Sequence, residues 1–491
     1  MEVSEYQSYD ATGLAELVAR RDVSPAELLD CAMARLDEVN PTLNAVVSNL
    51  EPQARRAIAD GLPNGPFAGV PFLLKDVTTQ MAGVVTSGGS HVLAEVVAQE
   101  DSALVAAYKR AGLNIFGKAN TPEFGLVGVT EPALFGATLN PWNLGLTCGG
   151  SSGGSASAVA AGIVPAAQAS DAGGSIRIPA SCCGLFGLKP SRGRVSMAPG
   201  GEGWGGLTVL HALTRSVRDS AALLDVSCEP QLGDPYWLPK PETPFADEAG
   251  RAPGRLRIGM LTRNLNGSDM AAPCAAGVRA AAALCESLGH DVEEIVLPPG
   301  LEALTPATTQ LSCASLAVTL EREAERRGRP IGRGEIEPLT RKLYELGKGV
   351  SGVQYAMAVQ TIHAIARRVA AWRDRYDVLL LSTLGRLPIP VGMLKGELGD
   401  LAELVAKFYD FGPNTQLFNA TGHPAMSVPL AWSDDGVPIG IQFVGRAAGE
   451  AELLRLAAQL ESAQPWADRR PPELADSTTT ARIAILQGET R

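Results

Sequence analysis

Apolar and polar positions along the chain change from helical spacing to short apolar runs and back again. From Leu29 to Val39 the apolar residues recur every three or four positions, which predicts a helix with one apolar face. Ser24 and Glu27 have the spacing of a capping box, and Pro25 stands at the first helical position. We therefore expect this helix to begin directly after Ser24.

Short apolar runs bounded by turn residues predict buried strands between further helices. The first such strand is expected at 71–74, inside "GPFAGVPFLLKD". Next come a helix over 101–111 that Gly112 ends, a strand at 113–118, a tightly packed helix from Ser155 and a strand at 163–168. The same alternation returns with strands in 255–261, 290–297, 376–382, 425–430 and 440–445, and a helix over 271–288. This order predicts an α/β fold in which helices cover both faces of a large mixed or mainly parallel sheet.

Three segments depart from this alternation. Residues 301–375 read as long helices, which we expect to form a helical cap or insertion over the sheet. Residues 229–244 form a Pro-rich connector, and the stretch after Pro465 is typical of a loosely attached tail. We find no internal repeat. At 491 residues the chain is long enough to bury a sizeable active centre.

Charge and cysteine content exclude several classes of partner. The 42 basic and 53 acidic residues give a net charge of −11, without a block of Lys or Arg, so nucleic acid and membrane surfaces are not expected partners. The N-terminus has no apolar region typical of a signal peptide, and no stretch is apolar enough to span a membrane. Eight cysteines in such a long chain are expected to be reduced thiols, which favours a cytoplasmic location. The adjacent Cys182 and Cys183 are interpreted as buried packing, and no metal site or cofactor is expected.

A glycine- and serine-rich run, "CGGSSGGSASAVAAG" (148–162), lies within a segment without any formal charge, 132–170. Flexible linkers and disordered tails usually carry low hydrophobicity and high charge, so this run is expected to be structured. It contains GxSxG, but the turn-rich stretch 139–147 before it does not resemble the strand of a nucleophile elbow. None of the five histidines stands in a catalytic motif, and no lysine follows the glycines as a phosphate loop requires. A serine nucleophile here needs another base, and Lys75 at the end of an apolar strand is a candidate, because burial lowers the pKa of a lysine.

The chain resembles the amidase signature family through a series of motifs in matching order. They are Lys75-Asp76, "GKANTPEFG", "GGSSGGSASAVAAG", "SDAGGSIRIPAS", "GLKPSRGRVS", "NATGHPAMSVP" and "DGVPIGIQFVG". The resemblance extends over nearly the whole chain. It implies one amidase signature domain over 1–491, with the catalytic core motifs in 60–215 and the helical cap or substrate-pocket region in 300–375.

The resemblance also implies site residues. Ser175 corresponds to the nucleophile, Ser151 to a bridging serine that follows a cis peptide bond, and Lys75 to the base. The backbone N–H groups of Ala172, Gly173, Gly174 and Ser175 are expected to form the oxyanion hole. Ser152 is expected to hydrogen-bond within the same network, and Asp171 and Arg177 to brace the loop rather than to touch the substrate.

Within the family the chain is most similar to the nylon-oligomer hydrolases of the 6-aminohexanoate cyclic dimer type, through "NPWNLG", "TRSVRDSAALLDV" and "QLESAQPWADRRP". The implied activity is hydrolysis of non-peptide amides through an acyl-enzyme. Hydrolysis of carbamates or esters by the same triad, a glutaminase-like amidotransferase subunit and a non-catalytic binding module stay open as alternatives. The expected partner is a small-molecule amide, carbamate or ester, and the chain is expected to be a monomer or homodimer.

Substrate choice is expected to depend on four pocket residues and on the helices in 301–372. The four are Phe124, Leu126, Phe135 and Cys313, although a packed thiol is the favoured interpretation of the last. Two positions depart from the family pattern: Cys148 stands where proline is common before the glycine run, and Ser382 replaces another common proline. Neither belongs to the expected triad, but both make the local loop geometry harder to infer.

Overall fold

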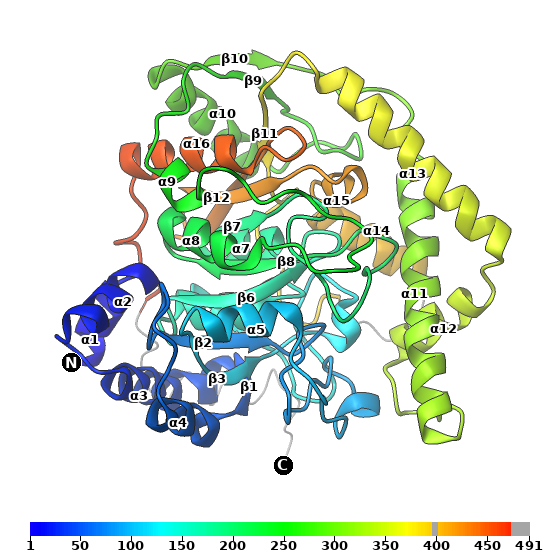
Figure 1. The fold of residues 1–491 in the computed structure, drawn as a ribbon. Helices are drawn as coiled ribbons and strands as arrows, with labels where there is room; N and C mark the ends of the chain where they lie inside the picture. The colour runs from blue at the N-terminus through cyan, green and yellow to red at the C-terminus, as the bar shows by residue number, and fades with distance from the viewer. Residues whose placement is uncertain (395–400, 473–491) are drawn as a thin grey trace.

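The fold is organised around one large mixed sheet, drawn in Figure 1. The computed structural model describes residues 1–394 and 401–472. Within these residues the sheet has 11 strands. From one edge to the other they are β1 (Val46–Asn49), β3 (Asn114–Ala119), β2 (Pro71–Lys75), β6 (Ala166–Asp171), β8 (Val209–Thr214), β7 (Phe186–Lys189), β12 (Ala425–Trp432), β13 (Pro438–Val444), β11 (Val378–Ser382), β9 (Arg257–Met260) and β10 (Asp291–Glu294). Both halves of the chain therefore contribute to one sheet.

Strand direction decides which residues meet at the edge of the sheet. Strands β3, β2 and β6 are parallel, as are β11, β9 and β10, whereas the remaining pairings are antiparallel. Leu73 of β2 pairs with Ala167 of β6. Because parallel neighbours run in the same direction, their last residues, Lys75 and Asp171, lie on the same side of the sheet, at the carboxyl ends of the strands. The carboxyl ends of strands in open α/β sheets commonly form ligand sites.

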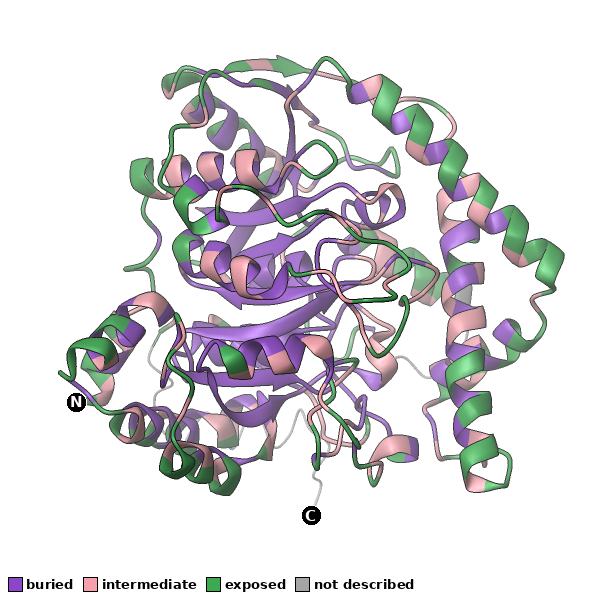
Figure 2. Ribbon diagram, viewed as in Figure 1, coloured by how far each residue is buried: buried purple, intermediate pink, exposed green. Residues whose placement is uncertain are grey.

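Helices flank the sheet, and their outward faces carry many of the residues coloured as exposed in Figure 2. The inner strands are almost entirely buried, as their continuous apolar runs predict, whereas the edge strand β10 is largely exposed. The helices are α1 (Val3–Ser8), α2 (Ala11–Arg20), α3 (Pro25–Leu43), α4 (Glu51–Asp60), α5 (Ala103–Arg110), α6 (Gly153–Ala160), α7 (Arg177–Cys183), α8 (Val217–Ser227), α9 (Phe245–Ala249), α10 (Ala272–Ser287), α11 (Leu304–Arg327), α12 (Pro338–Lys348), α13 (Gly352–Arg373), α14 (Leu401–Phe411), α15 (Gln416–Thr421) and α16 (Glu450–Ala463), with short 3₁₀ turns η1 (His91–Leu93) and η2 (Glu123–Gly125). No helix within the described ranges has the length and apolar character needed to cross a bilayer.

Most elements predicted from the sequence are confirmed with shifts of a few residues at their ends. Helix α3 begins at Pro25, and Ser24 and Glu27 form the expected reciprocal capping box. Helix α5 ends before Gly112, whose φ of 85° suits a residue without a side chain. Each strand expected between 255 and 445 is present as β9, β10, β11, β12 or β13. All eight cysteines are buried and free, including the adjacent pair Cys182 and Cys183 in α7.

The prediction of an irregular, turn-rich stretch at 139–147 is wrong in part. Strands β4 (Leu139–Asn140) and β5 (Asn143–Thr147) form a separate two-stranded antiparallel hairpin around Pro141 and Trp142. Strand β5 alternates exposed and half-buried residues, as a half-buried strand does. Its Asn and Gly residues are typical of turns, so they obscure this pattern in the sequence. The segment still leads directly into the glycine-rich run.

The segment 304–373 consists of the three helices α11, α12 and α13, which form an arm along one side of the molecule in Figure 1. A small apolar cluster lies at the base of this arm and includes Val92, Leu316 and Leu320. A second cluster joins Leu311 of α11 and Ile362 of α13 to Leu207. The arm is therefore attached to the rest of the molecule through Val92 of η1 and through Leu207 in the loop before β8.

The two ends of the described chain meet beside β8. The Arg215 guanidinium donates to the carbonyl oxygens of Gln7 and Tyr9, and the Trp466 indole N–H donates to the Arg215 carbonyl at 2.7 Å. The Arg470 Nη2 group donates to the same Gln7 carbonyl at 3.0 Å. Thus the first helix and the segment after α16 are attached to one turn.

Candidate active site

Lys75, the last residue of β2, is buried at the edge where β2 and β6 end. Its Nζ donates to Ser151 Oγ at 2.7 Å and to Ser170 Oγ at 2.9 Å. Burial lowers the pKa of Lys75 to about 7, although the negative charge of Asp171 acts in the opposite direction. An amine in this environment exchanges a proton near neutral pH, as a general base requires.

Ser151 reaches Lys75 from the glycine-rich run before α6. The peptide bond between Gly150 and Ser151 is cis, as the family resemblance implied. Gly150 is packed against the backbone of Val129, and a Cβ atom at Gly150 would lie 2.7 Å from that backbone. Only glycine therefore fits at this approach. A Cβ at Gly125 would likewise lie 3.1 Å from Ser151 Oγ, so the segment after η2 borders the same hydroxyl group.

Ser175 lies in the loop between β6 and α7 and is partly exposed to solvent. Its carbonyl accepts a hydrogen bond from the Ser152 backbone N–H at 3.3 Å. Ser152 also pairs with Ser170: its hydroxyl donates to the Ser170 carbonyl at 3.2 Å and accepts from the Ser170 N–H at 3.3 Å. These bonds join the glycine-rich run to the end of β6, and so bring the segment of Ser175 beside that of Ser151.

Asp171 and Arg177 form an ion pair at 2.9 Å in which neither side chain is exposed. Burial alone would raise the pKa of Asp171, but the Arg177 charge and its hydrogen bonds lower that pKa to about 2. The carboxylate also accepts from the backbone N–H groups of Gly174 and Ile176. The pair thus fixes the loop that carries Ser175 from the inside.

One of the expected oxyanion donors, Gly174, has an acceptor within the loop. The Gly174 N–H donates to Asp171 Oδ1 at 2.7 Å, so it is already engaged inside the loop. Thr415 Oγ1 donates to the Gly173 carbonyl at 2.5 Å, which holds the other side of the loop. Among the described residues no acceptor is found for the backbone N–H groups of Ala172, Gly173 and Ser175. These three are the remaining candidates for binding a developing oxyanion.

Four contacting residues were missed by the sequence analysis: Ser170, Thr415, Asn419 and Gln442. Arg177 donates to the Thr415 carbonyl, to Asn419 Oδ1 and to Gln442 Oε1. Asn419 Nδ2 in turn donates to the Asp171 carbonyl at 3.0 Å and to the Leu207 carbonyl at 3.2 Å. Ser170 and Asn419 stand in the motifs "SDAGGSIRIPAS" and "NATGHPAMSVP", which were the available signal.

The four expected pocket residues do not form one group. Phe124 and Leu126 pack against the apolar cluster of α11 and α12, whereas the Phe135 carbonyl accepts from Asn44 Nδ2 at 2.7 Å. Cys313 is buried in α11, where its carbonyl is packed against Gly347 of α12. Burial raises the pKa of the Cys313 thiol to about 11. Its surroundings fit the packed-thiol interpretation.

A cavity of about 810 Å³ lies between the arm and the loop 197–208. Its lining includes Thr78, Glu202 and Trp204 from the sheet side and Arg322 and Tyr355 from α11 and α13. This volume is within the range of small-molecule sites. In the described part of the chain, which contains all five histidines, none of them hydrogen-bonds to Ser151 or Ser175. His211, for example, pairs with Ser220 at 2.8 Å.

Comparisons with known proteins identify the family of this chain. The Amidase family model matches residues 27–454. A 6-aminohexanoate-cyclic-dimer hydrolase of Pseudomonas sp. (strain NK87) is 40% identical over 482 residues, which cover 95% of this chain and 97% of that protein. A solved structure of 6-aminohexanoate cyclic dimer hydrolase superposes with a TM-score of 0.89 at 39% identity, covering 96% of this chain and 99% of that one. A bacterial aryl acylamidase of the amidase signature family has a TM-score of 0.85 at 27% identity, covering 94% and 99%.

Proposed function

The chain belongs to the amidase family, and from this premise we propose that it hydrolyses non-peptide amides by way of an acyl-enzyme on Ser175. Cyclic amide dimers of the 6-aminohexanoate type are the proposed first substrates, because two of the similar proteins carry that activity in their names. One observation carries the chemistry: Lys75 is buried and its Nζ lies 2.7 Å from Ser151 Oγ.

Proton movement in the proposed reaction begins at the contact between Lys75 and Ser151 and extends to Ser175 in the neighbouring loop. Neutral Lys75 accepts the Ser151 hydroxyl proton, Ser151 accepts the proton of Ser175, and Ser175 Oγ forms a bond with the amide carbonyl carbon. When the C–N bond breaks, Lys75 returns the proton through Ser151 to the leaving nitrogen. Water then attacks the ester of Ser175 by the same route, releases the carboxylic acid and restores the serine hydroxyl.

The N–H groups of Ala172, Gly173 and Ser175 are proposed to bind the oxyanion that forms during both attacks. Asp171 and Arg177 act as positioning residues, since their buried ion pair fixes the backbone from which these groups point. Removal of one oxyanion donor in other hydrolases costs about 10²- to 10³-fold in rate. The cavity beside the arm is the proposed route for the rest of the substrate.

The direct test is an activity panel on the purified chain with the 6-aminohexanoate cyclic dimer, linear amides, anilides, carbamates and esters. Hydrolysis of amides is expected to exceed that of the other bonds. Preferred carbamate or ester hydrolysis would replace the proposed substrate but keep the triad. Amide hydrolysis by the single purified chain would exclude an amidotransferase subunit that depends on partners.

Two variants test the residue roles. Ser175→Ala and Lys75→Ala should each lose at least about 10³-fold in kcat and Ser175→Ala should lose labelling by a fluorophosphonate probe. Ser227→Ala is a matched control, because this buried serine bonds only to carbonyls of its own helix, Leu223 and Leu224. Full labelling of Ser175→Ala would assign the nucleophile to another residue.

A further inference from the structure

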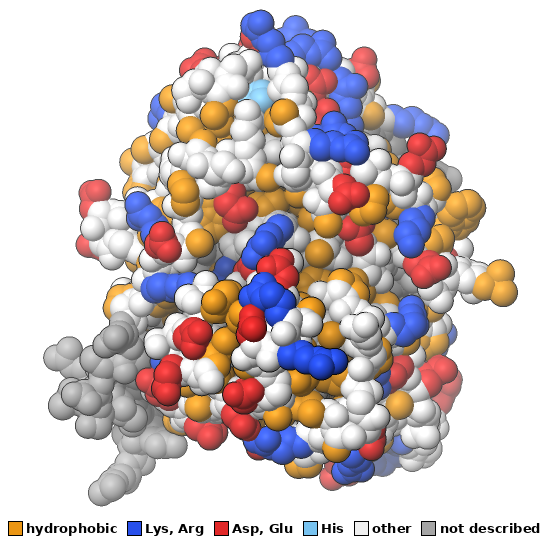
Figure 3. Space-filling model, turned by 60° about the vertical axis from the view of Figure 1, so that its left-hand side comes forward, with side chains coloured by type: hydrophobic (Ala, Val, Ile, Leu, Met, Phe, Trp, Pro, Cys, Tyr) orange, Lys and Arg blue, Asp and Glu red, His pale blue; other side chains and the backbone are white. Residues whose placement is uncertain are grey.

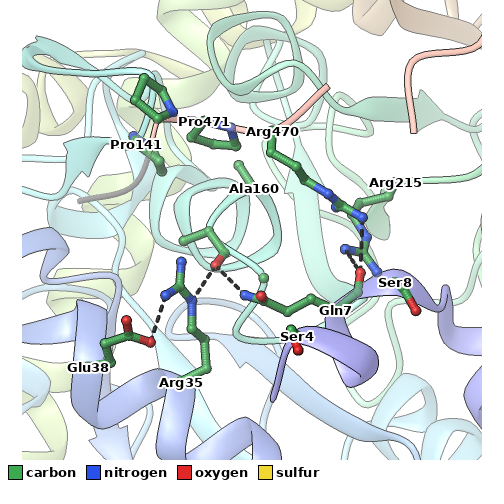
Figure 4. Close-up of a pocket in the computed structure, with 13 residues that line it drawn as sticks. Ser4, Gln7, Ser8, Arg35, Glu38, Pro141, Ala160, Arg215, Arg470 and Pro471 are labelled. Atoms are coloured by element: carbon green, nitrogen blue, oxygen red, sulfur yellow. Dashed lines mark hydrogen bonds and ion pairs between the residues drawn. The ribbon is translucent and has the colours of Figure 1, made fainter. Parts of the chain in front are cut away.

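A second cavity, of about 650 Å³, lies on the side of the molecule where the two ends of the described chain meet. Its lining comes from α1, α3, the end of α6, the turn after β8 and the segment 470–472. Lys75, Ser151 and Ser175 are not among its lining residues. Figure 4 shows the residues that line this cavity, which we call the terminal pocket.

The terminal pocket is positively charged in an otherwise acidic protein. Arg35, Arg215 and Arg470 line it, with Glu38 as the one acidic side chain of the lining. The chain as a whole has a net charge of −11, and on the face drawn in Figure 3 acidic and basic side chains are interspersed. A local excess of guanidinium groups is therefore a feature of this pocket and not of the composition.

Hydrogen bonds to backbone carbonyls hold the three guanidinium groups in place. Arg35 Nε donates to the Ala161 carbonyl at 2.9 Å, and both Arg215 and Arg470 donate to the Gln7 carbonyl. Arg35 also pairs with Glu38 at 2.7 Å, but Glu38 is 63% exposed, and such pairs contribute little. Within the described ranges, Arg215 and Arg470 form no ion pair with a carboxylate. Both cations are thus positioned without a contacting counter-ion from residues 1–394 or 401–472.

The closeness of these charges has an electrostatic cost. Burial and the positive charge of Arg470 lower the pKa of Arg215 to about 10, although Tyr6, Asp219 and Asp10 act in the opposite direction. Burial also lowers the pKa of Arg470, with Asp468 as the opposing charge. A bound anion would offset this repulsion, and the planar guanidinium forms paired hydrogen bonds with oxyanions.

The terminal pocket also has an apolar part. Pro141 and Pro471 lie beside each other in Figure 4, Arg470 adjoins Pro471, and Ala160 lies between the prolines and Arg35. A pocket lined by both guanidinium groups and prolines fits a molecule that has an anionic group on a hydrocarbon body. A free inorganic ion would use only the arginines and leave the prolines without a contact.

We propose that the terminal pocket binds a small organic anion, with its oxyanion group on Arg470, Arg215 and Arg35 and its hydrocarbon part against Pro141 and Pro471. A carboxylate and a phosphate ester share this chemistry. The site does not depend on the proposed amide hydrolysis, because no residue of that site lines it.

Titration calorimetry on the full chain at constant ionic strength tests the proposal, with hexanoate, hexyl phosphate and inorganic phosphate as probes. Saturable binding of one hexanoate or hexyl phosphate per chain is expected, and the tighter of the two identifies the anionic group. Inorganic phosphate should bind at least tenfold more weakly. Equal binding of inorganic phosphate would refute the apolar half of the site, and no saturable heat with any probe would refute the site itself.

Two variants locate the binding. Arg470→Gln and Arg35→Gln should each weaken binding about tenfold, since each removes a charged donor to the anion. Arg56→Gln on α4 is the matched control: Arg56 is exposed, lies outside the pocket lining and changes the net charge equally. Its affinity should equal that of the unchanged chain. Unaltered affinity in Arg470→Gln would place the anion elsewhere, for instance at the active site as a bound acid, and would overturn the assignment.

Discussion

Replacement of Ser170 by alanine tests how Lys75 is held near neutrality. Ser170 Oγ accepts a hydrogen bond from Lys75 Nζ at 2.9 Å, next to the 2.7 Å bond to Ser151. A hydrogen bond to a charged group contributes about 1.5 to 3 kcal/mol, and one pKa unit corresponds to about 1.36 kcal/mol. Because the ammonium form uses this bond most, Ser170→Ala should lower the pKa of Lys75 by about 1 to 2 units.

The assay is the pH dependence of kcat/KM with an uncharged anilide, which reports the ionisation of the free enzyme. The pKa of Lys75 is about 7 in the unchanged protein, so its acid limb should have a midpoint there. Below this pH the ammonium form accumulates and activity should fall about tenfold per pH unit. In Ser170→Ala the midpoint should move to about 5 to 6, so the variant keeps activity at lower pH.

Ser157→Ala is the control for this experiment. Ser157 is also a buried serine, but its hydroxyl donates to the Leu139 carbonyl at 2.9 Å and not to Lys75. Its midpoint should not change. A midpoint above about 9 in the unchanged protein would mean that burial does not neutralise Lys75, and an upward shift in Ser170→Ala would contradict the assigned direction of the hydrogen bond.

Three further substitutions have expected outcomes. Asp171→Asn leaves the Arg177 charge buried without its partner and should lower the free energy of unfolding by about 3 to 5 kcal/mol in urea titrations; a loss below about 1 kcal/mol would contradict this. Gly125→Ala places a Cβ 3.1 Å from Ser151 Oγ and should reduce kcat. Gly83 has a similar positive φ but open space around it, so Gly83→Ala should change only stability. Equal kcat in the two variants would refute the steric argument. Burial and the charges of Asp10 and Asp219 raise the pKa of Glu461 to about 7. The folded state therefore retains a proton that the unfolded chain releases, and the stability from this group falls as pH rises from about 4.5 through 7. Glu461→Gln should weaken the dependence of the unfolding free energy on pH in this range, and an unchanged dependence would exclude Glu461 as its source.

The apolar runs of the sequence predicted the central strands well, but not those that lack such a run. Strands β2, β11 and β13 are buried along their whole length, so their sequences are nearly continuous in apolar residues. Strand β8 is also buried throughout, yet it contains His211, and β7 contains Gly187 and Lys189. Burial of these residues depends on partners such as Ser220, which tertiary structure supplies and periodicity does not reveal.

In the candidate site, the sequence predicted which side chains meet but not the direction in which the backbone N–H groups point. The motifs predicted Lys75 and Ser151 as neighbours, which their 2.7 Å contact confirms. They did not predict that the Gly174 N–H turns inward to Asp171, because the direction of a backbone N–H depends on dihedral angles such as the φ of 141° at Gly174. Ser170 was missed because a small polar residue in a strand has many ordinary roles.

The contact between Arg470 and Gln7, 3.0 Å from donor to acceptor, makes the path of the described chain almost a closed ring. Covalent joining of its two ends by a short peptide would therefore require little rearrangement, and a break could be opened instead in the exposed Pro-rich connector at 229–244. Such a circular permutant would keep every strand in its place in the sheet, while the two parts of the terminal pocket that come from the chain ends, α1 and 470–472, would belong to one continuous segment.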